Sequence, residues 1–396
     1  MTTATVLRLL DAPPGLDDEQ LLRRARSARH KLAATLLSLW EAEGRDLTQA
    51  QIAELAASRE RVAAYGRIWG ELRRCAPDAV LLKGLAVAAL YPPGVLRSAG
   101  DLDVVCPGYA DFWACANQLA YGGWELEAFT VGPARPGDSV PHHLFAEFRK
   151  ASGISPAGDP ADPMAPSGPE PFAVGLVTAE IVTDLRAPAR ELTRPARSAL
   201  ATSAVALVAE RWERPFRSRD LLDLVLLLRG LDAAGAEQLR ADLGRAGLWP
   251  EWREAVSRIR GLGWRPAVTL PGTRAAAVRE RALRALRAVR RESHPVRGLA
   301  RLARTGIEAE DGRLADFASD LLERWPGPLR VLDLGLPLFG VPLDGPASAD
   351  FGLERRGRHL LARTPLGPFL LVAGAARQEW LDEVGAGSGA RSNTAV

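Results

Sequence analysis

The chain has 396 residues, 47% of them hydrophobic and 25% charged, and its formal net charge is only +3. This composition is typical of globular proteins, excludes a fibrous or disordered chain, and provides no overall basic field for nucleic acid. No apolar run approaches the roughly 20 residues that span a bilayer, and the N-terminus lacks the basic-then-apolar order of a signal peptide. We therefore expect a cytoplasmic protein of two to three domains with no membrane partner.

Lysine and cysteine are both scarce in this chain. Arginine supplies nearly all of the 51 cations, so a lysine at a special place is more informative than usual. The lysines are Lys31, Lys83 and Lys150. The three cysteines, Cys75, Cys106 and Cys115, show no paired spacing. They predict neither a disulfide framework nor a zinc site, and they fit a reducing compartment.

Four regions follow one another along the chain. Residues 1–75 predict an N-terminal helical region, because apolar residues recur at three- and four-residue spacing and Thr48 can cap a helix that runs to about residue 75. Residues 76–195 alternate short apolar strands with helices and predict a mixed core. We expect a helical domain over 196–310. Over 311–396 we expect a C-terminal appendage of strands and loops that ends in a disordered tail.

The order within residues 76–195 is strand, glycine turn, helix, strand. The first strand is predicted over 79–82 and the second over 101–105, with Lys83-Gly84 and a small-residue helix between them. The Pro-, Gly- and Ser-rich residues 151–171 predict a flexible insertion. Further strands are expected over 124–131, 142–150 and 172–185.

The second strand carries two acidic residues in the order Asp101-Leu102-Asp103. Side chains alternate across a strand, so both carboxylates share one face, about 7 Å apart along the chain, while Leu102 points into a core. Two carboxylates at the mouth of a sheet can bind one or two hard cations such as Mg²⁺ or Mn²⁺. An acidic pair is also common on solvated strand faces, so the surrounding residues decide between the two interpretations.

A glycine and two cations accompany this acidic pair along the sequence. Gly84 sits where a strand passes into a helix, and a glycine there lets ligand oxygens approach the backbone and the first helical amides. Lys83 can place a positive charge on a phosphate, and Arg97 can supply a second one. Together they predict a phosphate-binding turn beside a metal site, whereas each residue alone is equally typical of a turn or of a solvated charge.

Residues 81–105, LLKGLAVAALYPPGVLRSAGDLDVV, resemble the signature of the bacterial nucleotidyltransferase-like family within the DNA polymerase β nucleotidyltransferase superfamily. The shared order is an apolar strand, Lys-Gly, a small-residue helix, Tyr-Pro, an arginine, and Asp-x-Asp on a strand. The resemblance implies an α+β fold with a polymerase-β-like core, which is a small mixed sheet with flanking helices. It also implies that the glycine turn and the arginine hold the triphosphate of an NTP, and that the two aspartates bind Mg²⁺.

Such folds use a third carboxylate from a later strand, within a Glu-apolar-His-aromatic pattern. In AEIVTDL, Glu180 aligns best with that acid, and Val182 and Thr183 replace the histidine and the aromatic residue. Asp184 competes with Glu180 because residues i and i+4 of a strand face the same side. The resemblance thus implies Glu180 as third metal ligand or base, with Asp184 as the competing third ligand. The missing histidine is compatible with a chain that has lost its activity.

Other polar residues invite weaker hypotheses. His142 and His143 match a histidine position often seen in the family and could orient a substrate or move a proton, but a surface or core histidine is equally consistent. Asp220 and Asp223 lie in a segment resembling the family's downstream helix, where they more simply cap or orient that helix. The arginine-rich run 274–304 predicts either a solvated helix or a surface for phosphate backbones.

The leading functional hypothesis is a Mg²⁺-dependent nucleotidyltransferase. It would transfer NMP from an NTP to a hydroxyl of a small molecule, a peptide or protein, or an RNA end, and release pyrophosphate. One alternative is a non-catalytic descendant that keeps the fold and binds a partner. A weaker alternative is a nucleic-acid adaptor built on the arginine-rich run.

Overall fold

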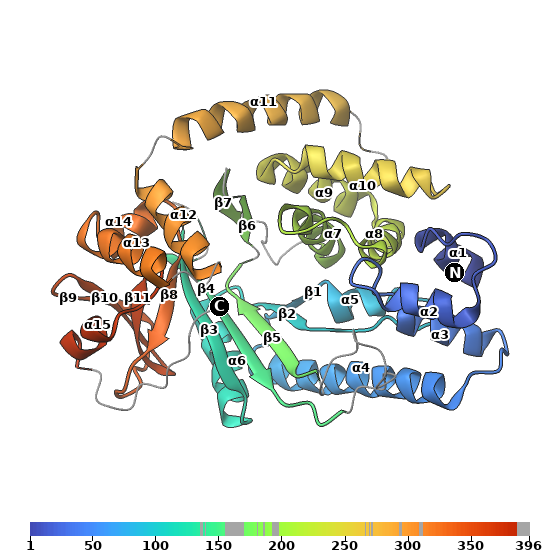
Figure 1. Ribbon diagram of the computed structural model, residues 1–396, viewed down its shortest axis with the longest axis horizontal. Coiled ribbons are helices and arrows are strands. Elements are labelled where there is room, and N and C mark those ends of the chain that lie inside the picture. The colour runs from blue at the N-terminus through green and yellow to red at the C-terminus, as the bar shows by residue number, and fades with distance from the viewer. Residues whose placement is uncertain are drawn as a thin grey trace.

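The computed structural model describes residues 1–134, 138, 140–154, 170–179, 181–184, 187–191, 198–265, 267–268, 270, 272–292, 295–308 and 312–385. Helices and a nine-stranded mixed sheet give an α+β fold (Figure 1). Three predictions fall on residues outside this description. They are most of the insertion at 151–171, the third-ligand candidate Glu180, and the end of the C-terminal tail.

The helices are, in chain order, α1 (Thr3–Leu9), α2 (Asp18–Arg26), α3 (Ala33–Ala42), α4 (Gln49–Cys75), α5 (Gly84–Ala88), α6 (Tyr109–Tyr121), α7 (Ala199–Ala209), the 3₁₀ turn η1 (Glu210–Trp212), α8 (Ser218–Gly230), α9 (Ala233–Ala246), α10 (Trp249–Gly261), α11 (Thr273–Glu292), α12 (Pro295–Glu308), α13 (Gly312–Arg324), α14 (Pro328–Asp333) and α15 (Gln378–Glu383). The strands are β1 (Val80–Leu82), β2 (Leu102–Val105), β3 (Glu125–Pro133), β4 (His142–Lys150), β5 (Phe172–Val177), β6 (Ile181–Asp184), β7 (Ala187–Glu191), β8 (Leu338–Pro342), β9 (Gly352–Arg356), β10 (His359–Thr364) and β11 (Gly367–Val372).

The large sheet has the strand order β1-β2-β5-β4-β3-β8-β11-β10-β9. Strands β2 and β5 are parallel, and every other neighbouring pair in this sheet is antiparallel. A parallel pair needs a crossover, and here the chain between β2 and β5 passes through α6 and the β3–β4 hairpin. Strands β6 and β7 pair only with each other, as a separate antiparallel hairpin.

The prediction of a small sheet is wrong, because the sheet has nine strands. The additional strands come from the C-terminal region, where β8 pairs with β3 through Val131↔Leu338 and Thr130↔Phe339. Strands β11, β10 and β9 then continue the same sheet. An open strand edge presents unpaired N–H and C=O groups, and β8 satisfies those of β3. Residues expected to form an appendage therefore extend the central sheet.

Local sequence signals account for the helix that runs along one side of the sheet. Helix α4 starts after Thr48, whose hydroxyl accepts from the backbone N–H of Gln51 at 3.3 Å. The side chain of Gln51 accepts in return from the backbone N–H of Thr48 at 3.0 Å. This reciprocal capping box confirms the predicted helix and its N-cap residue.

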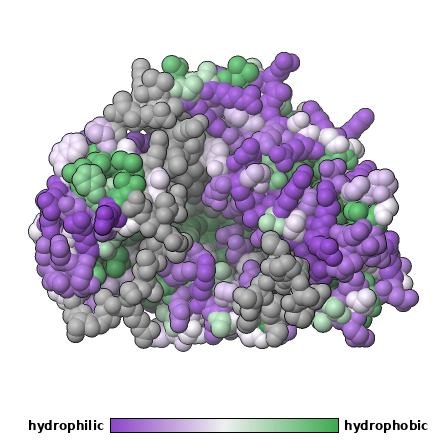
Figure 2. Space-filling model, in the orientation of Figure 1, coloured by the Kyte–Doolittle hydropathy of each residue, from purple (hydrophilic) through white to green (hydrophobic). Residues whose placement is uncertain are grey.

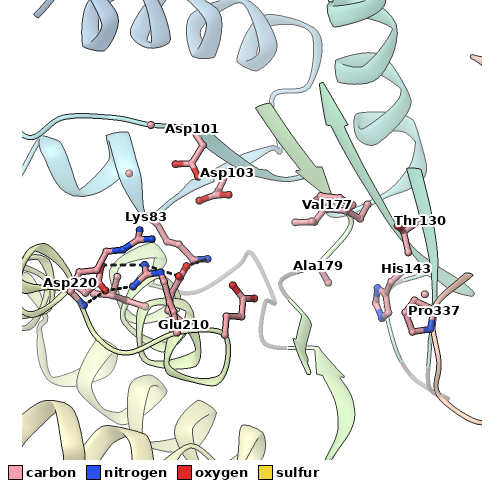
Figure 3. A pocket seen from close by; sticks show the side chains of 18 of the residues that line it. Lys83, Asp101, Asp103, Thr130, His143, Val177, Ala179, Glu210, Asp220 and Pro337 are labelled. Atoms are coloured by element: carbon pink, nitrogen blue, oxygen red, sulfur yellow. Dashed lines mark hydrogen bonds and ion pairs between the residues drawn. The ribbon is translucent and has the colours of Figure 1, made fainter. Parts of the chain in front are cut away.

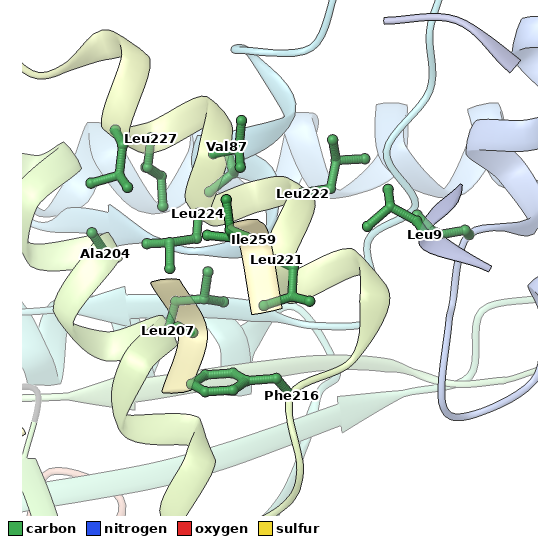
Figure 4. Close-up of a cluster of buried hydrophobic side chains, with 14 of the residues drawn as sticks. Leu9, Val87, Ala204, Leu207, Phe216, Leu221, Leu222, Leu224, Leu227 and Ile259 are labelled. Atoms are coloured by element: carbon green, nitrogen blue, oxygen red, sulfur yellow. The ribbon is translucent and has the colours of Figure 1, made fainter. Parts of the chain in front are cut away.

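The buried apolar side chains form two large cores. One core lies among the helices of the N-terminal region and α7–α10, and the other packs α4, α6 and α12–α14 against the sheet. Figure 4 shows part of the helical core, in which α5, α7, α8 and α10 each contribute side chains. They include Val87, Leu207, Leu221, Leu224 and Ile259. The cavity described below takes residues from elements of both cores.

The face seen in Figure 2 is mostly hydrophilic, with apolar side chains gathered over α13 and α14 and along α11. On α11, which crosses above α9 and α10 in Figure 1, Val278 is 60% and Leu286 64% exposed. Phe317 and Leu329 are the exposed apolar residues of α13 and α14. Within the described part of the chain, no helix combines the length and the apolar character that crossing a membrane requires.

Candidate metal and phosphate site

A cavity of about 670 Å³ lies between one face of the sheet and the ends of α7 and α8. Strands β2, β5, β4 and β3 supply its floor, and the loop before α3 supplies Lys31 at the rim. The C-terminal region contributes Gly335 and Pro337. Figure 3 shows Asp101 and Asp103 between Lys83 on one side and Val177, Thr130, His143 and Pro337 on the other.

Two of the predicted metal ligands, Asp101 and Asp103, line this cavity. Asp103 lies on β2 and is partly buried, while Asp101 directly precedes that strand and is exposed. Leu102 and Val104 are completely buried, as the alternation of side chains across a strand requires. The sheet therefore presents both carboxylates to the same space, and their hard oxygen donors suit Mg²⁺.

The turn between β1 and α5 holds Lys83 in an unusual backbone conformation. Its φ of 51° and ψ of −139° are strained for a residue with a side chain. A Cβ atom added to Gly84 would lie 3.4 Å from the carbonyl oxygen of Asp101, so the turn packs closely against the entry to β2. The Lys83 Nζ donates to Glu210 Oε1 at 3.0 Å. This ion pair connects the turn to η1, which begins at Glu210.

Arg97 lines the cavity but is bound within the protein. Its Nη2 donates to Asp223 Oδ2 at 2.7 Å, and the hydroxyl of Tyr91 donates to Asp223 Oδ1 at 2.7 Å. Burial opposes the charge of Arg97, but the attraction of Asp223 outweighs it and raises the pKa of Arg97. The pKa of Tyr91 is raised well above its ordinary value, mainly by burial and then by the negative charge of Asp223. This network ties α8 to the segment before β2.

Asp220 caps α8, in agreement with its predicted structural role. Its Oδ2 accepts from the backbone N–H of Arg217 at 2.8 Å and from Arg214 Nη1 at 2.6 Å. Arg214 also forms an ion pair with Glu210 Oε2 at 2.8 Å. Glu210 therefore stands between Lys83 and Arg214. This carboxylate was not predicted from the sequence, because it lies outside residues 81–105.

The two histidines occupy different surroundings. His143 is buried at the cavity end remote from Lys83, with its Nε2 3.0 Å from Asp138 Oδ2 and its Nδ1 3.4 Å from Thr178 Oγ1. His142 does not line the cavity; burial, and then the charge of His143, lower its pKa. Both ring nitrogens of His143 have partners in the protein, which is typical of a positioned core histidine.

The position beside Asp103 on the neighbouring strand is a glycine. In the parallel register of β2 and β5, Asp103 pairs with Gly175, and a Cβ built there would lie 3.8 Å from Asp103 Oδ1. Asp184 belongs to β6, in the separate hairpin. Among the described residues, no three His, Cys, Asp or Glu side chains gather closely enough to hold a metal ion. The alternation of buried and partly buried residues in FAVGLV could have predicted from the sequence that Gly175 lies on the cavity face of β5.

A wall of cations faces the aspartates and was not anticipated from the sequence. It consists of Lys31 from the loop before α3, Arg214 and Arg217 from the segment before α8, and Arg219 from the first turn of α8. In an arginine-rich chain these residues carry no distinguishing pattern, and only the scarcity of lysine marked Lys31. One side of the cavity thus favours a cation, and the other favours an anion.

No protein-family model, curated protein or solved structure matches the chain. The chemistry of the site therefore rests on the residues described above. Carboxylate oxygens for a hard cation and guanidinium groups for phosphate oxygens line the same cavity. That combination suits a metal-bound polyphosphate ester.

Proposed function

We propose that the protein is a nucleotidyltransferase that binds Mg²⁺–NTP in this cavity and transfers NMP to a hydroxyl acceptor. The observation that carries the proposal is that Asp101 and Asp103, at the start of β2, line the same cavity as the cations Lys31, Arg214, Arg217 and Arg219. A nucleoside triphosphate bridged by a metal needs both kinds of group at once. The resemblance of residues 81–105 to the nucleotidyltransferase signature points the same way.

Asp101 and Asp103 would hold the metal, which when bound neutralises charge on the α-phosphate and on the departing pyrophosphate. The Lys83-Gly84 turn would hold phosphate oxygens, because glycine lets them approach the backbone closely. The acceptor oxygen forms a bond to the α-phosphorus as the bond to the β-phosphate oxygen breaks. Glu180 remains the sequence candidate for the base that takes the acceptor's proton.

The acceptor would enter at the other end of the cavity. Val177, Ala179 and Pro337 give that end an apolar lining, and Thr130 adds a hydroxyl. A lining of this kind favours a partly apolar molecule over a highly charged one. We therefore expect the acceptor to be a compact hydroxyl compound.

The first experiment is calorimetric titration of each of the four NTPs, with and without Mg²⁺, into the wild type and the Asp101→Asn/Asp103→Asn double variant. We expect Mg²⁺-dependent binding that the double variant weakens at least about 100-fold, because both proposed metal ligands lose their charge. The matched control is Asp344→Asn/Asp350→Asn, since both of those aspartates are exposed and outside the cavity. Equal affinity in the wild type and the cavity double variant would refute the site.

A second candidate function is nucleotide binding without transfer. Gly175 favours it, because no carboxylate stands beside Asp103 on β5. The two functions differ in whether label from an α-³²P NTP becomes covalently attached to an acceptor. Transfer that requires Mg²⁺, Asp101 and Asp103 supports the enzyme. Tight Mg²⁺–NTP binding with no transfer to alcohols, peptides or RNA supports the binding protein.

A further inference from the structure

Within the described part of the chain, three cations of the cavity have no acidic partner. Lys31, Arg217 and Arg219 form no ion pair among the described residues, whereas Lys83, Arg97 and Arg214 of the same cavity each form at least one. The Nε of Arg219 is buried and has no hydrogen-bond partner. Its Nη1 makes only a long bond, 3.4 Å, to the carbonyl oxygen of Ser98. We refer to Lys31, Arg217 and Arg219 as the cation cluster.

The carboxylates nearest to Arg219 are already engaged. Asp220 accepts from Arg214 and from the backbone of Arg217, and Asp223 accepts from Arg97 and Tyr91. Burial, and then the charge of Arg97, lower the pKa of Arg219. A partly buried cation without a counter-charge is unfavourable for folding, so its retention in a cavity is typical of a functional site.

The backbone holds the cation cluster in place. The carbonyl oxygens of Arg29 and His30 accept from the N–H groups of Ser218 and Arg219 at 3.1 and 3.2 Å. The ring Nδ1 of His30 lies 2.6 Å from Ser218 Oγ. These bonds tie the loop that carries Lys31 to the first turn of α8. They also occupy the first amides of that helix, which leaves side chains, rather than the helix terminus, to bind an anion.

Lys31 has both an unusual backbone conformation and a lowered side-chain pKa. Its φ of 52° lies in the left-handed region, which is strained for lysine. Partial burial, and then the charges of Arg217 and Arg219, lower its pKa, while the charges of Glu170 and then Asp101 act in the opposite direction. The cation cluster is therefore close to the proposed metal ligands, on the Lys83 side of the cavity rather than at the apolar end.

We propose that the cation cluster is a polyphosphate subsite that holds the distal phosphates of the nucleotide. Guanidinium groups match phosphate oxygens in a two-pronged geometry, and a triphosphate supplies the counter-charge that the described residues do not. This assignment of the ligand rests on the proposed function, but the anion subsite does not. An anionic group of the acceptor has the same chemistry, and the experiment distinguishes it from the nucleotide.

The test compares the wild type with Arg219→Gln by calorimetry, using inorganic tripolyphosphate, Mg²⁺–ATP and AMP as probes. We expect the variant to bind tripolyphosphate and ATP about 10- to 100-fold more weakly and AMP within about threefold of the wild type. Lys31→Gln repeats the test at an exposed position, where a substitution disturbs folding less than at Arg219. Arg229→Gln, at the other end of the same helix and exposed, is the matched control.

Each outcome bears on the subsite. If tripolyphosphate binding requires Arg219 and competes with ATP binding, the assignment is supported. If tripolyphosphate binding requires Arg219 but does not compete with ATP binding, the cation cluster belongs to the acceptor site and the nucleotide subsite is overturned. Unchanged binding in both cavity variants overturns the anion subsite altogether. Arg219-dependent tripolyphosphate binding in a protein that binds no NTP would keep the anion subsite and refute the proposed function.

A stability measurement separates binding from a structural role. An unpaired buried charge destabilises the fold, so Arg219→Gln should melt at the same temperature as the wild type or higher. An arginine with a purely structural role would give a lower melting temperature and unchanged tripolyphosphate binding.

Discussion

His30 contacts Ser218, between Arg217 and Arg219 of the cation cluster, and its ring carries a proton on Nδ1. The hydroxyl of Ser218 donates to the carbonyl oxygen of Leu9 at 2.7 Å, so the ring Nδ1 of His30 must donate to that hydroxyl oxygen. The ring is only 2% exposed. Burial, and then the charges of Arg24 and Arg29, lower the pKa of His30 to about 4.

This pKa makes stability depend on pH. Between the ordinary value of about 6.5 and the folded value, the unfolded chain takes up a proton that the folded chain does not. The stabilisation is present above pH 6.5 and is lost as pH falls toward 4, with a total on the order of 3 kcal/mol. Urea unfolding at several pH values should show this slope in the wild type. His30→Asn keeps a donor for Ser218 and should flatten it; equal slopes would contradict the assignment.

Single residues of the site differ in how far the sequence predicts them. Asp101 and Asp103 share a face because alternation on a strand is a local property. The pairing of Lys83 with Glu210 joins residues far apart in the chain and has no local signal. Arg219 differs from the other arginines only in its surroundings, because the nearby carboxylates of Asp220 and Asp223 accept hydrogen bonds from Arg214 and Arg97 instead. Its role therefore emerges only from the folded arrangement.

At the scale of elements, α8 is attached to the segment before β2 by the buried ion pair of Arg97 and Asp223. Asp223 is completely buried and Arg97 is 5% exposed. The pair fixes α8, and with it the cation cluster, relative to the aspartates. Helix α8 itself was predictable from its apolar periodicity, and β4 has the predicted bounds, His142–Lys150. The sequence did not predict which other element each of them packs against, because that packing depends on residues far away in the chain.

Breaking this ion pair on one side should be costly. Asp223→Asn leaves the Arg97 charge buried without a counter-charge, so we expect the free energy of unfolding to fall by about 3–5 kcal/mol. The double variant Arg97→Met/Asp223→Leu removes both charges and should be destabilised less than Asp223→Asn. Urea unfolding measures both. A single variant within about 0.5 kcal/mol of the wild type would show that the pair does not hold α8.

At the scale of the whole molecule, β8 joins the two parts of the sheet at a tightly packed point. Phe129 on β3 and Phe369 on β11 come from the two strands that flank β8, and their rings, with centroids 4.7 Å apart, meet over Gly340. A Cβ added to Gly340 would lie 2.6 Å from Phe129 Cδ1 and 3.3 Å from Phe369 Cδ1. Only a glycine at this position of β8 leaves room for the two rings to pack over the strand without being displaced.

Gly340→Ala should therefore destabilise the protein by about 1–3 kcal/mol, because the added methyl group overpacks the junction. Gly352→Ala, on the outer strand β9, is the control, since a Cβ there meets no atom within 4 Å. Thermal and urea unfolding of the two variants provide the comparison. An equal effect of the two substitutions would show that the junction adapts to the methyl group.

The late position of β8 in the chain also has a consequence during synthesis. Strand β3 leaves the ribosome long before its neighbour, because β8 follows it by roughly 200 residues, which take on the order of 10–40 s at about 5–20 residues per second. Throughout that interval one edge of β3, around Thr130 and Val131, has no strand to pair with. An open edge invites pairing with another nascent chain. Chains truncated before β8 should therefore aggregate, whereas the complete chain closes its own edge.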